Sequence, residues 1–145
     1  MIVAFDPRSD YPLGTKRPDL VRTRGGLGLE DLTLDSLRTG RLGATEMRAT
    51  PETLRLQAEV ARAAGRVQLA DSLERAAELA PIDDEVLLEI YTALRPHRSS
   101  ADELEAWASR LDDELGAPKT ASFVREAKTV YASRGLLATV SEPAL

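Results

Sequence analysis

Five helix start and stop signals follow one another between Thr50 and Gly135, and no other feature of the sequence constrains the fold as much. Each segment between them places apolar residues at steps of three and four, which is the repeat of an amphipathic helix. No segment alternates apolar and polar residues as a half-buried strand does. Helices are expected at about 51–64, 67–79, 83–94, 100–115 and 118–134. The pattern predicts an all-α fold, a compact bundle of about five long helices with an extended N-terminal arm.

Local signals also predict where these helices begin and how deeply they lie. Thr50 before Pro51 is typical of a helix start, and Ser100 with Glu103 forms a capping box. Gly65 follows the first long helix, where glycine readily adopts left-handed backbone. The third helix has an apolar stripe without alanine, which predicts deep burial; the stripe comprises Val86, Leu87, Ile90, Tyr91 and Leu94.

The first 50 residues differ in composition from the rest of the chain. Six of the nine glycines lie there, together with Pro7, Pro12 and Pro18, and the segment has eight basic and seven acidic residues, whereas residues 51–145 have eleven basic and seventeen acidic residues. Only short helical turns are expected, at 32–37 and 44–47. We therefore predict three parts: an extended arm over residues 1–31 that contacts a partner, a helical domain over 32–137 and a C-terminal tail over 138–145.

An arm without a core of its own exposes its apolar side chains unless another surface covers them. The side chains concerned are Phe5, Tyr11, Leu13, Leu20 and Val21. A covering partner surface is one interpretation, and a disordered tail is the other.

The residue inventory argues against catalysis by this chain. It has no cysteine and one histidine, His97, which excludes thiolate metal sites, thiol nucleophiles and paired imidazole ligands. His97 lies between Pro96 and Arg98 at a helix end, where a capping or exposed role fits better than a general base. The adjacent carboxylates Asp83 and Asp84 lack the spacing of a metal site. We predict no catalytic, cofactor-binding or metal-binding residues.

Charge and hydropathy also limit the classes of partner. A loose basic cluster at residues 16–24 lacks interleaved aromatic residues, and the chain has an isoelectric point near 5.0, so protein contact is favoured over nucleic acid. No apolar run approaches the roughly 18–20 residues that span a bilayer, and no signal peptide is recognisable. We expect no nucleic-acid or membrane partner and a cytoplasmic location.

Five segments together resemble a known family. They are DYPLGTKRPDL at 10–20, TPETLRLQAEVARAAGR at 50–66, ERAAEL at 74–79, DDEVLLEIYTALRPHRSS at 83–100 and ASFVREAKTVYASRGLL at 121–137. In order and spacing they are similar to the small subunit of adenosylcobalamin-dependent diol and glycerol dehydratases. The resemblance spans residues 10–137.

The resemblance implies a small, non-catalytic subunit of a complex that converts 1,2-propanediol or glycerol to the aldehyde and water by radical rearrangement. It implies large and medium subunits as partners, in a dimer of heterotrimers, with the main contact to the large subunit. Adenosylcobalamin would be held by those other subunits and not by this chain. The segment TPETLRLQA inclines us towards propanediol over glycerol, although substrate contacts would lie on another chain.

The subunit interface is expected to use the arm and the arginines of the helices. Tyr11 and Leu13 would act as apolar anchors, with Pro12 holding the chain extended. Guanidinium groups can lock one subunit to another through paired hydrogen bonds. The candidate interface residues are Tyr11, Pro12, Leu13, Lys16, Pro18, Arg55, Arg95, Arg98 and Arg125.

Two other functions remain open from the sequence, together with one question of location. The chain could be a free-standing helical adapter with no enzymatic role, or a small autonomous enzyme using His97 and a carboxylate.

Relatives packaged in bacterial microcompartments often carry an amphipathic targeting helix before the DYPL-like block. Only nine residues precede Asp10 here, so we expect no encapsulation signal on this chain, while association with a microcompartment stays possible.

Overall fold

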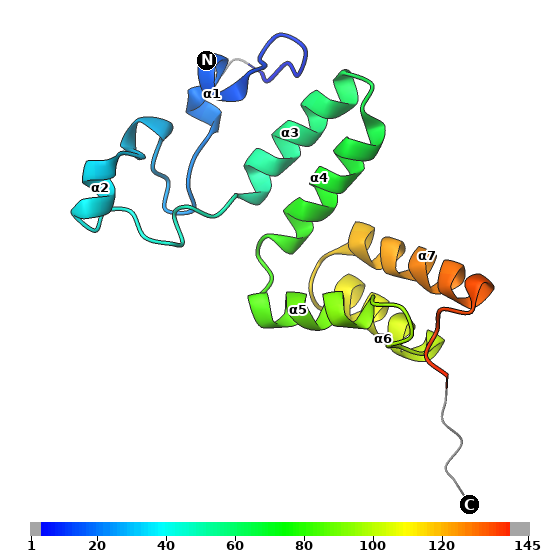
Figure 1. Cartoon of the computed structure of the whole chain (residues 1–145). Coiled ribbons are helices and arrows are strands. Elements are labelled where there is room, and N and C mark those ends of the chain that lie inside the picture. Colours follow the sequence, from blue (N-terminus) through cyan, green and yellow to red (C-terminus); the bar gives the residue numbers. More distant parts are fainter. Residues whose placement is uncertain (1–3, 140–145) are drawn as a thin grey trace, which may run out of the picture. The chain divides into compact units, whose positions relative to one another are not determined.

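The computed structural model describes residues 4–139, and these divide into two compact units on either side of the Ala80–Pro81 bond. Helices account for all the regular structure of the described residues (Figure 1), apart from an isolated antiparallel bridge between Arg22 and Gly28. The predicted all-α class is confirmed. The division into an arm, a domain and a tail at residues 31 and 137 stays a prediction.

The N-terminal unit holds four helices and two short 3-10 turns. The helices are α1 (Leu13–Lys16), α2 (Leu34–Arg38), α3 (Pro51–Ala63) and α4 (Val67–Leu79), and the 3-10 turns span Pro18–Leu20 and Leu29–Asp31. The C-terminal unit holds α5 (Asp84–Ala93), α6 (Ala101–Asp113) and α7 (Pro118–Arg134). The five predicted long helices are therefore α3 to α7.

Capping explains why the predicted boundaries hold. The Thr50 hydroxyl accepts from the Thr53 backbone N–H at 3.4 Å. Ser100 and Glu103 form the reciprocal capping box, with backbone-to-side-chain distances of 2.8 and 3.2 Å. Gly65 has a φ of 76°, a left-handed conformation that ends α3 at little steric cost. These are interactions between near neighbours, so the sequence alone encodes them.

An alanine seam joins α3 and α4 into an antiparallel hairpin (Figure 1). Ala58, Ala61 and Ala70 are 1, 6 and 0% exposed, and Leu73 packs against them. Single methyl groups let two helix backbones approach closely, and they bury less apolar area than leucines would. Across the same hairpin, the Arg62 guanidinium bonds Asp71 at 3.0 Å and Glu74 at 2.9 Å.

The C-terminal unit has the larger side chains in its core. Leu104, Leu111 and Val124 are the largest fully buried side chains of the described residues, and all lie where α6 packs on α7. The predicted deep burial of α5 is wrong. Ile90 is its one buried residue, while Leu88 and Tyr91 are 66 and 65% exposed, because within its unit α5 packs mainly on α6 and turns only the Ile90 stripe inward.

Candidate functional site

The loop around His97 is a structural connection. His97 is exposed and has a left-handed φ of 62°, and its backbone N–H donates to the Leu136 carbonyl at 2.7 Å. The Tyr131 hydroxyl donates to the Leu94 carbonyl at 2.5 Å, and the Ala138 N–H donates to the Ser99 carbonyl at 2.9 Å. These bonds tie the loop to the end of α7. Among the described residues, the His97 side chain forms no hydrogen bond with a hydroxyl or carboxylate group.

The N-terminal arm folds onto its own unit. Leu13 is 7% exposed, whereas Tyr11 is 62% exposed two residues earlier. The Arg17 guanidinium forms ion pairs with Asp10 at 2.9 Å and with Asp19 at 3.0 Å. The hydrogen bond to Asp19 and, second in size, the one to Asp10 raise the pKa of Arg17, and Arg17 in turn lowers the pKa of Asp19. The expectation that Leu13 needs a partner to cover it is therefore wrong, because residues of the same chain already bury it.

A groove lies between this arm and the α3–α4 hairpin, with a volume of about 750 Å³. We call it the arm groove. Its charged lining side chains are those of Arg8 and Arg66, and the first turn of α4 has no acidic residue. The arm groove is thus an apolar surface with two cationic side chains in its lining. Its apolar lining residues are Pro7, Tyr11, Leu13, Val60, Ala61, Ala63, Ala64, Leu69 and Leu73.

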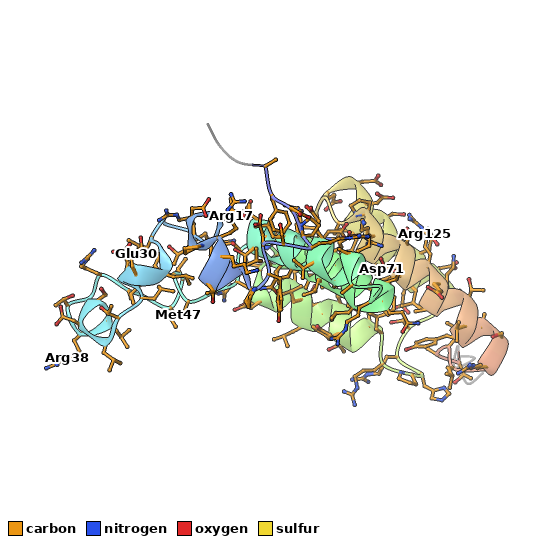
Figure 2. All side chains as sticks on the ribbon, turned by 90° about the horizontal axis from the view of Figure 1, so that it is seen from above. Arg17, Glu30, Arg38, Met47, Asp71 and Arg125 are labelled. Atoms are coloured by element: carbon orange, nitrogen blue, oxygen red, sulfur yellow. The ribbon has the colours of Figure 1, made fainter. Side chains whose placement is uncertain are left out.

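A second apolar surface surrounds α2, because this helix buries a polar residue and exposes its leucines. Ser36 is the buried residue of α2, and its carbonyl accepts from the Leu42 N–H at 3.0 Å. Leu34 and Leu37 are instead 80 and 54% exposed. Met47 is also exposed, and Figure 2 shows it projecting from the ribbon, as does Arg38. The sequence analysis missed this surface, although the spacing of Leu34 and Leu37 on one helical face was a usable signal.

The remaining predicted interface residues separate into exposed side chains and internal ones. Pro12 and Pro18 are exposed at the starts of α1 and the first 3-10 turn, and Lys16 donates to the Ser9 carbonyl at 2.9 Å. Arg125 is engaged within its own unit, as described below. The exposed arginines of the predicted set are Arg55, Arg95 and Arg98.

The comparisons with known proteins identify the family. The model of the "Dehydratase small subunit" family matches residues 7–138. A propanediol dehydratase small subunit of Citrobacter freundii is 50% identical over 126 residues, which is 87% of this chain and 73% of that relative. One of Salmonella typhimurium is 49% identical with the same coverage.

The chain belongs to the dehydratase small subunit family. The resemblance drawn from the five sequence segments is thereby confirmed.

The described residues of this family member contain no group of three or more His, Asp or Glu side chains that could hold a metal ion. His97 is the one imidazole of the chain, and it does not line the arm groove. An imidazole ligand would have to face a cavity to meet a bound group. None of the described helices combines the length and the apolar character needed to cross a bilayer.

An ionic cluster joins α6 to α7 in this small subunit. Glu105 accepts from Arg125 at 2.9 Å and from Lys128 at 2.5 Å, and Arg125 also reaches Asp112 at 3.3 Å. Hydrogen bonds from Lys128 and, second in size, from Arg125 lower the pKa of Glu105. Hydrogen bonds to Glu105 and, second in size, to Asp112 raise the pKa of Arg125. Arg125 was predicted to lie at a subunit interface, and its side chain forms ion pairs within the C-terminal unit.

We expect acid to weaken the C-terminal unit partly through Glu105. Its folded-state pKa is lowered, so the stabilisation is present above the unfolded pKa, near 4.3 for an ordinary glutamate, and is lost as the pH falls through the folded value. Urea unfolding of Glu105→Gln should therefore vary less between about pH 5 and pH 3 than that of the native chain. Glu126→Gln, on an exposed residue of α7, is the control. An identical pH dependence for native and Glu105→Gln would contradict this role.

Proposed function

We propose that this chain is the small, non-catalytic, structural subunit of an adenosylcobalamin-dependent diol dehydratase. Such a complex converts 1,2-propanediol, or glycerol, to the aldehyde and water by radical rearrangement. The observation that carries the proposal is the family match over residues 7–138, together with about 50% identity to two propanediol dehydratase small subunits. Propanediol is the proposed substrate of the assembled enzyme on the same ground.

The physical role proposed for the chain is to stabilise the assembly. A subunit that binds only the folded form of its partner raises the partner's stability by mass action. Two features of the N-terminal unit support this role: a small alanine-rich core between α3 and α4, and exposed apolar side chains around α2 and along the arm groove. Adenosylcobalamin, which supplies the radical chemistry when bound, would be held by other subunits.

The partners would be the large and medium dehydratase subunits in a dimer of heterotrimers, with the main contact to the large subunit. Of the predicted interface residues, we propose that those with exposed side chains reach the partner, namely Tyr11, Pro12, Lys16, Pro18, Arg55, Arg95 and Arg98. Leu13 and Arg125 would support the surface from within their own units.

Co-expression with the large and medium subunits tests this function. The chain should elute with both in size-exclusion chromatography, and the complex should form aldehyde from 1,2-propanediol when adenosylcobalamin is supplied. The chain alone should form none. A monodisperse chain that ignores both subunits would support the adapter interpretation, and dehydration of glycols by the isolated chain would contradict a non-catalytic role.

Removing the histidine side chain should leave turnover almost unchanged. Because His97 lies in a solvent-exposed loop held by backbone bonds, we expect kcat and KM of the assembled enzyme to stay within about twofold in His97→Ala and His97→Gly. Glycine adopts the left-handed φ at this position without strain, so His97→Gly separates loss of the imidazole from loss of the turn. A loss of about 100-fold in kcat in both variants would instead support the autonomous-enzyme interpretation.

A further inference from the structure

The arm groove combines an apolar floor with positive charge at two separate places. Arg8 belongs to the arm, and Arg66 belongs to the turn between α3 and α4, so the two charges stand on different walls. Among the described lining residues there is no carboxylate. The groove therefore presents cations to whatever enters it and offers no negative charge of its own.

Both guanidinium groups have donor capacity left for a ligand. Hydrogen bonds from the Ser9 hydroxyl and then from the Arg8 backbone N–H are the main causes that lower the pKa of the Asp6 carboxyl. The charge of the Arg8 guanidinium lowers this pKa to a smaller extent. Among the described residues, neither Arg8 nor Arg66 forms a side-chain hydrogen bond or ion pair. A carboxylate is the partner that a guanidinium group binds best, through two parallel hydrogen bonds.

Apolar side chains at the edge of the groove are exposed in the isolated chain. Tyr11 is 62% and Leu69 46% exposed, on opposite sides of the groove. Clustered apolar side chains with a charged rim are the arrangement of a protein-binding surface. Tyrosine and arginine are also the residue types that dominate binding energy at such surfaces.

We propose that the arm groove binds an apolar segment of the dehydratase large subunit whose ends carry aspartate or glutamate. This assignment rests on the proposed function, since it takes the large subunit as the partner. The apolar part of the segment covers Tyr11 and Leu69, and its carboxylates pair with Arg8 and Arg66. Charge complementarity makes this contact sensitive to salt, because ions screen exposed charge pairs.

Charge reversal tests the assignment on the co-expressed complex. The double variant Arg8→Glu with Arg66→Glu is compared with Arg24→Glu with Arg134→Glu, which changes net charge equally at two exposed arginines that do not line the groove. On a tagged large subunit, we expect the groove variant to be retained at least about tenfold less than the native chain at low salt. Retention of the native chain should fall as salt rises to about 0.5 M, whereas the control should behave like the native chain. Unchanged helical circular dichroism excludes unfolding.

The outcomes separate this inference from the proposed function. If the native chain is not retained on the large subunit at all, the proposed function fails. If the native chain is retained and the groove variant is retained equally, or the control loses as much, the function stands and the groove assignment is overturned. A photo-crosslinking residue at position 69 adds a second measurement. The adduct should be an acid-flanked peptide of the large subunit, and an adduct with the medium subunit or with a second small subunit would overturn the proposal.

Discussion

Leu111→Ala is expected to lower the free energy of unfolding of the C-terminal unit by about 2–5 kcal/mol. Leu111 is 0% exposed and is one of the largest fully buried side chains of the described residues. Its truncation removes apolar contacts and leaves a cavity that the packed α6–α7 pair can only partly close. Truncation of a fully buried leucine is among the large stability effects expected of a single substitution.

Urea denaturation followed by tryptophan fluorescence measures this effect selectively. Trp107 is the single tryptophan of the chain and lies in α6, so its signal reports the C-terminal unit. Leu88→Ala is the matched control, because the same atoms are removed from a side chain that is 66% exposed, and we expect a change within about 0.5 kcal/mol. If Leu111→Ala does not fold, Leu111→Val removes less volume and should still destabilise. Equal midpoints for native, Leu111 and Leu88 variants would contradict the described core.

Deletion of residues 1–20 should reduce retention of the chain on a tagged large subunit by at least about tenfold. The deletion removes one wall of the arm groove and the exposed ring of Tyr11. Far-UV circular dichroism should change little, since the deleted stretch includes only α1 of 4 residues and a 3-10 turn of 3 residues. Leu13→Asp should have a similar effect without shortening the chain, because a carboxylate at a buried position detaches the arm.

Thr15→Ala provides the control for the arm, since Thr15 is exposed on α1 and only its backbone N–H forms a described bond. Retention of this variant should equal that of the native chain. Equal retention of the deletion variant would show that the arm is not an anchor. If Leu13→Asp is retained like the native chain while the deletion variant is not, the arm binds its partner without being held to α3 and α4.

Features encoded by near neighbours were predictable from the sequence, and features that depend on distant packing were not. The starts of α3 and α6 follow from Thr50 and Ser100, each of which bonds a residue three positions ahead. The orientation of α2 does not follow, because the hydrophobic pattern would turn Leu34 and Leu37 inward, whereas the tertiary fold buries Ser36 between them.

The candidate site shows the same division. Tyr11 was recognised as an exposed apolar residue of the arm, and it is exposed. The groove beside it could not be predicted, since it requires the arm to lie against α3 and α4, more than 40 residues further along the chain. Arg125 reaches Glu105 across 20 residues, and periodicity shows only that each lies on a helix surface, not which residue each one meets.

The alanine seam sets a limit on how this hairpin can diverge. Ala61 belongs both to the seam and to the lining of the arm groove. A longer side chain there would push the two helix axes apart and reshape the recognition surface in the same event. Ala61 is therefore held to a small side chain by two requirements, the close packing of the two helices and the shape of the groove, whereas Ala58 and Ala70 answer to the packing alone.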